Sequence, residues 1–256
     1  FDSGGAIHIN RGCQALINRN TFIGNKAIWW ESNGGWNFRG GYGAAIATSD
    51  AFAFSPIISN NYCFNNLSQT SVVYTSNLNA LIFNNIICNN FSVGVFDGHQ
   101  LSYSRIFNNT IINNTSSNGG IMLISGAIAY NNICWGNENQ SGQIHDQIDL
   151  SQASYGYMLF NNCVEYGDGG TNSINVYPEF EDPTEGAGLL FEGADADWSL
   201  RDESPCINHG AMDTTGLFIP EYDIEGNPRI YGTAVEMGAI ENQNVIIGII
   251  NPESQA

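Results

Sequence analysis

The amino-acid sequence predicts an all-β solenoid of about six coils, built from stacked parallel strands and followed by an acidic C-terminal capping module. Three observations lead to this fold class: a repeat of about 24 residues, a pair of asparagines at one place in each repeat, and an abrupt change in charge near Glu165. Charged residues make up only 12 % of the 256 residues, so Asn, Ser, Thr and Gly must form much of the surface.

Pairs of asparagine mark the repeat. The second asparagine of each pair stands at positions 20, 61, 85, 109, 132 and 162, so the intervals are 41, 24, 24, 23 and 30 residues. An apolar residue stands three positions before each of these asparagines and another stands two positions after it. Short β-branched segments at this period predict strands, because helical repeats need longer units and a period of about 3.6 residues.

The asparagines have a structural role in this prediction. Asn tolerates the left-handed backbone conformation that a sharp turn between two strands requires. Its amide can also donate a hydrogen bond to the same side chain in the next coil, about 4.8 Å away. Stacked rows of Asn would therefore satisfy polar groups that a closed coil buries.

A further strand precedes each asparagine turn, at residues 5–9, 44–48, 72–75, 93–96 and 120–123. Because side chains alternate along a strand, one set of residues is expected to face the core and the next to face outward. The inward set is Ile7, Ile46, Val73, Val95 and Ile121, and the outward set is His8, Ala47, Tyr74, Phe96 and Met122. A slip of one residue in any repeat would exchange the two faces.

The acidity of the chain is concentrated in its C-terminal part. Residues 165–241 contain 17 Asp and Glu against two Arg, whereas residues 1–164 contain seven acids and five bases. The formal net charge of -18 disfavours binding to nucleic acid and to anionic membranes. Direct insertion into a membrane is not expected either, because no apolar run reaches the roughly 18 residues that span a bilayer.

The repeat in residues 1–167 resembles the right-handed parallel β-helix superfamily, which has the pectate-lyase-like fold. The acidic residues 168–241 resemble the module that ends many exported bacterial β-helix proteins of the choice-of-anchor type. This second resemblance rests on residues 178–180 (PEF), 198–200 (WSL), 204–210 (SPCINHG), 223–229 (DIEGNPR) and 235–241 (VEMGAIE). Asn208 and Glu236 depart from the family's pattern, which more often has Asp there.

The resemblance implies an exported bacterial protein that is secreted or held at the cell surface. It also implies that the acidic module packs on the end of the helix, with residues 242–256 as a tail or linker. The first strand pattern begins abruptly near Gly4, without a covering segment. This beginning predicts either further coils before Phe1 or end-to-end self-association.

Enzymes of this superfamily that cleave polysaccharides place their catalytic groups on one exposed strand face. Hydrolysis needs two carboxylates, and elimination needs a base together with cations that neutralise the sugar carboxylate. The outward set predicted above contains no carboxylate, Lys or Arg. The acid–base candidates are instead Asp50, Asp97 and His99 at the ends of these strands, with turn-capping Asp and a surface His as the alternative interpretation.

The interval of 41 residues contains an insertion at about residues 26–41 that is rich in aromatic side chains. Flat apolar rings with polar edges suit the faces of sugar rings. The candidate glycan-binding residues are Trp29, Trp30, Trp36, Phe38 and Arg39, joined by Tyr74 of the outward set. Packing of the same rings onto the flank of the solenoid is the alternative interpretation.

Asp223 and Glu225 stand at alternate positions just before Gly226, and this pattern superficially resembles a calcium loop. The later acidic ligand of an EF-hand is missing. Bound Ca²⁺ is therefore one interpretation and a metal-free acidic turn is the other, and no other cofactor is expected. Cys63 and Cys88 are expected to be core thiols on opposite faces of one sheet, which argues against a disulfide between them.

Together these features favour a non-catalytic, adhesin-like protein that binds a polysaccharide or another cell-envelope partner. One alternative is a polysaccharide lyase or glycoside hydrolase that acts on an extracellular polysaccharide. The other is a structural spacer that only displays neighbouring domains.

Overall fold

The structure is a computed structural model that describes ten stretches of the chain. They are residues 5–9, 14–28, 43–48, 55–75, 79–97, 103–117, 120–122, 126–144, 146–151 and 156–244, with the backbone alone for Asp97 and Met122. All regular elements within these stretches are β-strands, which confirms the all-β prediction for them. No helix in these stretches is long and apolar enough to cross a membrane.

Parallel strands form three sheets of six strands and one sheet of four. The first sheet has the order β1 (Ile7–Ile9), β5 (Ile46–Thr48), β9 (Ser71–Thr75), β13 (Gly94–Asp97), β17 (Ile121–Met122) and β20 (Ile148–Asp149). The second has β2 (Leu16–Asn18), β6 (Ile57–Ser59), β10 (Leu81–Phe83), β14 (Arg105–Phe107), β18 (Ile128–Tyr130) and β21 (Met158–Phe160).

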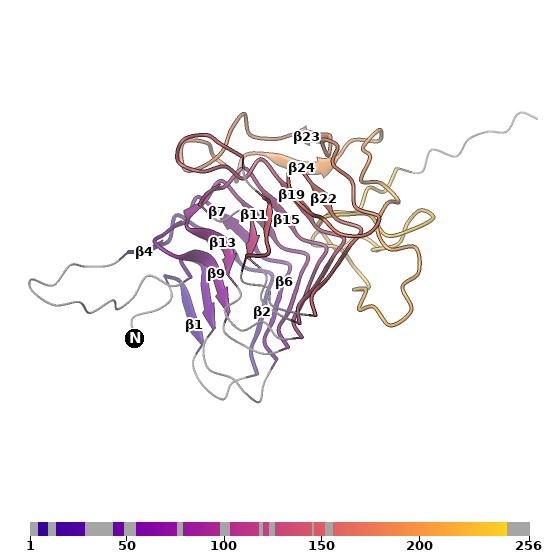
Figure 1. The fold of residues 1–256 in the computed structure, drawn as a ribbon, viewed down its shortest axis with the longest axis horizontal. Coiled ribbons are helices and arrows are strands. Elements are labelled where there is room, and N and C mark those ends of the chain that lie inside the picture. Colours follow the sequence, from indigo (N-terminus) through magenta and orange to yellow (C-terminus); the bar gives the residue numbers. More distant parts are fainter. Residues whose placement is uncertain are drawn as a thin grey trace, which may run out of the picture.

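The third sheet follows the second along the chain. It contains β3 (Thr21–Ile23), β7 (Tyr62–Phe64), β11 (Ile86–Cys88), β15 (Thr110–Ile112), β19 (Ile133–Trp135) and β22 (Cys163–Val164). The short fourth sheet contains β4 (Lys26–Ala27), β8 (Leu67–Ser68), β12 (Phe91–Ser92) and β16 (Thr115–Ser116). One passage of the chain through the four sheets forms one coil of a solenoid (Figure 1).

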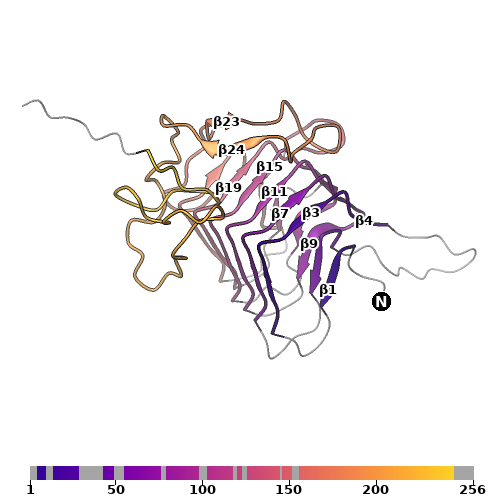
Figure 2. The same ribbon diagram turned by 180° about the vertical axis from the view of Figure 1, so that it is seen from behind.

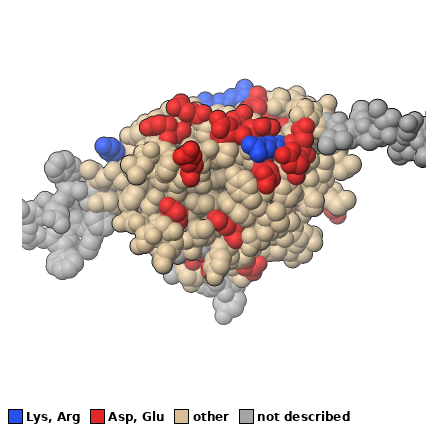
Figure 3. All heavy atoms as spheres, turned by 90° about the horizontal axis from the view of Figure 1, so that it is seen from above, with Lys and Arg blue, Asp and Glu red and all other residues tan. Residues whose placement is uncertain are grey.

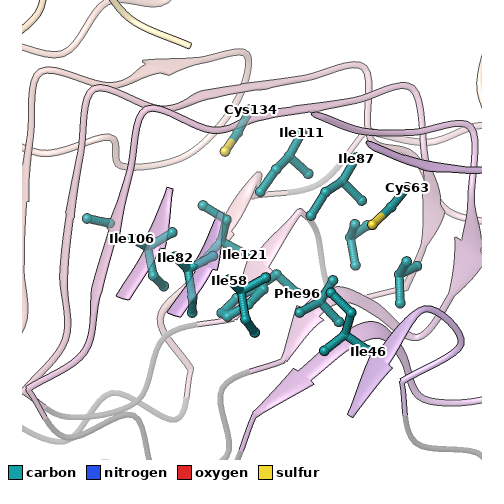
Figure 4. Close-up of a cluster of buried hydrophobic side chains, with 14 of the residues drawn as sticks. Ile46, Ile58, Cys63, Ile82, Ile87, Phe96, Ile106, Ile111, Ile121 and Cys134 are labelled. Atoms are coloured by element: carbon teal, nitrogen blue, oxygen red, sulfur yellow. The ribbon is translucent and has the colours of Figure 1, made fainter. Parts of the chain in front are cut away.

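Strands one repeat apart pair in register, so equivalent residues lie directly beside one another. Ile58 pairs with Ile82, which pairs with Ile106, and the third sheet follows the same rule. The predicted stacking of successive repeats is therefore confirmed. Side chains from three sheets meet in one elongated apolar core, whose members include Ile46, Ile58, Cys63, Ile82, Ile87, Phe96, Ile106, Ile111, Ile121 and Cys134 (Figure 4).

Two ladders of asparagine side chains follow the stack. In the first ladder, Oδ1 of Asn85 accepts hydrogen bonds from the backbone N–H and the Nδ2 of Asn61, both at 3.0 Å. The same two bonds recur from coil to coil. The first ladder joins Asn20, Asn61, Asn85, Asn109, Asn132 and Asn162, and the second joins Asn25, Asn66, Asn90, Asn114 and Asn137.

Within each pair, one residue makes the turn and the other forms the hydrogen bonds of the ladder. The residue just before each asparagine of the first ladder has a positive φ: Arg19, Asn60, Asn84, Asn108, Asn131 and Asn161. At the second corner, Asn65, Asn89 and Asn113 adopt the same conformation, with Gly24 and Gly136 in the other two coils. The first Asn of a pair therefore makes the turn, and the second carries the ladder.

Each ladder ends on a polar side chain that is not an asparagine. Oγ of Ser173 accepts the backbone N–H of Asn162 at 2.9 Å and terminates the first ladder. Oε1 of Gln147 accepts the backbone N–H and the Nδ2 of Asn137, at 3.1 and 2.7 Å, and terminates the second. Thr171 forms a parallel bridge with the last strand of the second sheet. These contacts satisfy buried polar groups at the C-terminal end of the stack.

The acidic C-terminal region lies along the flank of the solenoid, where both ribbon views show it beside the second and third sheets (Figures 1 and 2). It contains an antiparallel pair, β23 (Phe180–Asp182) and β24 (Asp197–Leu200). Turn asparagines of several coils donate their Nδ2 to its backbone carbonyls: Asn65 to Phe191, Asn84 to Tyr222, Asn108 to Glu236 and Asn161 to His209. Residues 178–241 therefore cover a side of the stack, whereas Thr171 and Ser173, near the start of the predicted module of residues 168–241, lie at its C-terminal end.

The apolar outer face of the third sheet explains this placement. Ile86, Cys88, Ile112, Ile133 and Cys163 point away from the core, and they are buried against Phe180, Trp198, Leu200, Cys206, Ile224, Met237, Ala239 and Ile240. An uncovered apolar face of this size would be unfavourable in water. The five described cysteines are buried and unpaired, and Cys63 and Cys88 lie in different clusters, as expected.

One arginine is buried at the junction between the solenoid and the acidic region. The guanidinium of Arg229 donates to the side-chain oxygen of Asn84 and to the carbonyls of Gly238 and Ala239, and it lies 3.4 Å from the carboxylate of Glu241. Glu236 is buried close by, where its carboxylate accepts the N–H of Asn242 at 2.8 Å. Acidic side chains are thus sealed inside the junction together with one positive charge.

Candidate functional site

The outer row of the first sheet is the first candidate site. Register places His8 beside Ala47, Ala47 beside Tyr74, Tyr74 beside Asp97, Asp97 beside Met122 and Met122 beside Asp149. These six residues are called the outer row below. Because neighbouring strands lie about 4.8 Å apart, the row presents one side chain per strand along a line.

The outer row differs from the predicted outward set in one coil. Phe96 pairs with Val73 and Ile121 and is 1 % exposed, so it faces the core, and Val95 is buried in the same apolar cluster as predicted. Gly94 pairs with Ser71, which shifts this strand by one residue relative to the prediction. The prediction that Phe96 faces outward is therefore wrong.

This shift brings carboxylates into the row. Asp97 takes the register position that had been assigned to Phe96, and Asp149 of β20 extends the row by one strand. The expectation that the row contains no carboxylate is corrected by the same pairings. Asp149 was missed because it lies within the irregular interval of 30 residues between Asn132 and Asn162, although the alternation Gln147, Ile148, Asp149 is visible in the sequence.

The described side chains of the row differ in exposure. His8 is exposed, Tyr74 and Asp149 are half-buried, and Ala47 is fully buried despite its predicted outward orientation. Oδ1 of Asp149 accepts the backbone N–H of Ser151 at 2.8 Å, so the carboxylate is held at the end of its strand. The described side chains of the row therefore combine a phenol, an imidazole and a carboxylic acid, and these groups suit hydrogen bonding to hydroxyls.

Most of the other predicted site residues lie outside the described part of the chain. This applies to Asp50 and His99 and to the aromatic insertion with Trp29, Trp30, Trp36, Phe38 and Arg39. Along the chain, the insertion connects β4 to β5, and β5 contributes Ala47 to the outer row. Sequence connectivity thus links the insertion to the first sheet.

The predicted calcium ligands lie in a tight, internally hydrogen-bonded turn. The Asp223 carboxylate, 1 % exposed, accepts the backbone N–H groups of Glu225, Asn227 and Glu241 at 2.8–2.9 Å and the Nδ2 of Asn227 at 3.3 Å. Glu225 is exposed. No group of three or more His, Cys, Asp or Glu side chains suited to a metal ion occurs in the described stretches. The geometry favours the structural interpretation of Asp223.

A second candidate site is a cavity of about 920 Å³ between the last strand of the second sheet and the acidic region. Its apolar lining includes Tyr157, Met158 and Phe160, and its polar lining includes Asn172 and His209. This volume lies within the range of known small-molecule sites, about 300–1,000 Å³. The sequence alone does not reveal this cavity, because its walls come from segments far apart along the chain.

The surface over the acidic region carries a strong negative charge. Seen from the side of β23 and β24, Asp and Glu gather over much of this face (Figure 3). Exposed acids there include Glu181, Asp182, Glu185, Glu192, Asp195, Asp197, Asp202 and Glu203. Such a surface repels polyanions, including polymers of uronic acids.

Comparison of the chain with models of known protein families, with curated proteins and with solved structures finds no match.

Proposed function

We propose that the protein is a secreted or cell-surface β-helix protein of the right-handed, pectate-lyase-like kind, which binds a neutral polysaccharide through its outer row without cleaving it. Three features support the architectural part of the proposal: the parallel sheets, the repeat and the asparagine ladders. Connections between parallel strands are right-handed in about 98 % of cases, which supports the handedness. The motifs of residues 204–241 support export and surface attachment of the choice-of-anchor type.

One observation carries the binding proposal: the register that lines up Tyr74, Asp97 and Asp149 across one sheet face. A linear polysaccharide laid across the strands would meet a new side chain at each strand spacing. A phenol ring can cover the face of a sugar, and carboxylates accept hydrogen bonds from its hydroxyls. The net charge of -18 favours a neutral polymer over a uronate.

The binding proposal is tested on an array of neutral and uronate-containing polysaccharides. The parent chain should bind a neutral polymer, and the double variant Tyr74→Ala, Asp149→Asn should bind it about tenfold less tightly, because a stacking surface and an acceptor are removed. The matched control is Tyr231→Ala, which removes a tyrosine that is 46 % exposed and lies outside the row. It should leave binding unchanged.

The contribution of the aromatic insertion to binding is measured separately with the double variant Trp29→Ala, Trp36→Ala. A loss of binding in this variant alone would move the site from the outer row to the insertion. A parent chain that binds no polymer on the array would refute the proposal.

A second function, glycoside hydrolysis, is favoured by the positions of Asp97 and Asp149. They stand two strand spacings apart, roughly 10 Å between backbones. Inverting glycosidases hold their two carboxyl groups about 6.5–9.5 Å apart, which such a spacing can provide. Uronate elimination has less support, because the outer row contains neither Lys nor Arg.

Hydrolysis predicts that the parent chain releases reducing ends from a neutral polysaccharide with inversion at the anomeric carbon, a change followed by NMR. Asp97→Asn and Asp149→Asn should each lower the rate by about a hundredfold or more, because each removes an acid or a base. Asp146→Asn, an exposed acid outside the row, is the control. A chain that neither binds nor hydrolyses any polymer would fit the structural-spacer alternative.

A further inference from the structure

Four aromatic rings stack along the outer face of the second sheet. The ring centroids of Phe83 and Phe107 are 4.9 Å apart, those of Phe107 and Tyr130 are 5.0 Å apart, and those of Tyr130 and Phe160 are 5.1 Å apart. The interplanar angles are only 9°, 6° and 1°. Register causes this arrangement, because the four residues pair with one another across β10, β14, β18 and β21.

The stack ends at Phe160, and this last ring lines the cavity of about 920 Å³. The next residue in the same column is Thr171, which forms a parallel bridge with Phe160. Thr171 is exposed and also lines the cavity. A small side chain therefore stands where a fifth ring would continue the column, and the cavity opens at this position.

The remaining walls combine flexible apolar groups with hydrogen-bonding groups. Met158 and Met212 are 55 % and 82 % exposed, and thioethers adapt their shape to an apolar surface. Asn172, His209 and Asp213 are also exposed and lie in the lining. Nδ1 of His209 lies 3.2 Å from the carbonyl oxygen of Ile207, which can only accept a hydrogen bond, so Nδ1 carries the hydrogen and donates it. In neutral His209 the other ring nitrogen is then a hydrogen-bond acceptor.

We propose that this cavity is a second saccharide site, in which one neutral pyranose ring stacks on Phe160 as the fifth member of the column. The apolar face of the sugar meets the phenyl ring, and its hydroxyls meet the amide, imidazole and carboxylate groups of the rim. The site lies at the last strand of the second sheet and is distinct from the outer row. It does not depend on the function proposed above.

The charge of the rim selects among ring-shaped ligands. Asp213 is the charged residue of the lining at neutral pH, and Lys and Arg are absent from that lining. A sugar acid would be repelled, whereas a neutral sugar can donate hydroxyl hydrogens to the carboxylate.

Saturation-transfer NMR on the full chain tests the proposal with cellobiose, lactose and maltose as probes. Digalacturonate is the anionic counterpart, and p-cresol represents a purely aromatic ring. Saturation should reach the ring hydrogens of one face of at least one neutral disaccharide and should be absent for digalacturonate. Two variants alter the stacking surface: Thr171→Phe puts a ring where the sugar would stack, and Phe160→Leu removes the last ring.

Each variant should weaken binding of the disaccharide by about tenfold or more, because stacking on a ring is the main contact. Thr171→Phe places its ring at an exposed position, so folding should be retained, and thermal melting verifies this. Tyr222→Ala removes a tyrosine that is 47 % exposed and outside the cavity, and it is the control that should bind as the parent does.

Three results would overturn the proposal: no saturation of any disaccharide in the folded parent, binding that survives Thr171→Phe, or binding of p-cresol alone. Thr171→Phe and Phe160→Leu alter only the cavity, whereas Tyr74→Ala and Asp149→Asn alter only the outer row. A failure of either site is therefore distinguishable from a failure of the other.

Discussion

At the corners of each coil, neighbouring asparagines have different tasks. Asn108 has a φ of 52°, which Asn adopts at lower cost than most residues, and its side chain reaches out to Glu236 of the flanking region. Asn109 is buried and uses both ends of its amide inside the stack. Its Oδ1 accepts two bonds from Asn85, and its Nδ2 donates to Asn132 and to backbone carbonyls. A single amide group thus ties three coils together.

Replacing Asn109 by Ala should lower the free energy of unfolding by about 2–4 kcal/mol, because several buried donors and acceptors lose their partners. Urea denaturation measures the change. The matched control is Asn20→Ala at the first position of the same ladder, where the side chain is only half-buried, so the loss should be smaller. Equal losses at both positions would contradict the assignment of the ladder as a buried network.

At the scale of the strand, β13 shows how pairing overrides a local pattern. The sequence Val93, Gly94, Val95, Phe96 allows either Val95 or Phe96 to face inward, because both are apolar. Pairing of Gly94 with Ser71 places Phe96 between Val73 and Ile121, and Val95 is buried beside it in the same apolar cluster. The consequence for function is that Asp97 pairs with Tyr74 and so belongs to the outer row. If Val95 took the place of Phe96 in the register, Asp97 would not belong to it.

The register of β13 predicts the effect of Phe96→Ala. The side chain is 1 % exposed, so its truncation should lower the free energy of unfolding by about 3–5 kcal/mol through lost burial and a cavity. The comparison is Val93→Ala, whose side chain is 41 % exposed and which should change stability by less than about 1 kcal/mol. A small effect at Phe96 in denaturant unfolding would restore the register that the sequence alone favours.

At the scale of the whole molecule, the acidic region stabilises the solenoid by covering its apolar flank. The junction holds the carboxylates of Asp223, Glu236 and Glu241 around one guanidinium, that of Arg229, and all four side chains are buried. Arginine stays protonated, so it can balance one of these charges but not all three. Burial raises the pKa of Glu236 to about 7, against the opposing effects of the Asn242 N–H and the Arg229 charge.

This junction predicts a pH dependence of stability. The native state holds the Glu236 proton up to about pH 7, whereas the unfolded chain releases it near its ordinary value of 4.5. Between these two pKa values the native state binds more protons than the unfolded chain does. The contribution of Glu236 to stability is therefore complete below pH 4.5 and is lost as the pH rises through about 7. Urea midpoints should fall as the pH is raised.

Glu236→Gln separates this effect from other titrations. Glutamine keeps an oxygen that can accept the Asn242 N–H but has no proton to lose in this range. The variant should unfold with a flatter pH profile and should be more stable than the parent above neutral pH. Identical slopes in parent and variant would show that Glu236 does not titrate in the native junction.

The amino-acid sequence by itself determined the repeat, the strands, the core rows of the second and third sheets and the asparagine ladders. Local periodicity encodes all of these, since each repeat places the same chemistry at the same offset. It also indicated Asp97 at the end of its strand, where β13 ends, but it missed Asp149.

Only the tertiary structure decided the register of β13, the composition of the outer row, the flank position of the acidic region and the cavity beside Phe160. The physical reason is common to all four. Each depends on which surfaces bury one another between residues far apart in the chain, and apolar residues such as Val95 and Phe96 satisfy a local pattern equally well on either face.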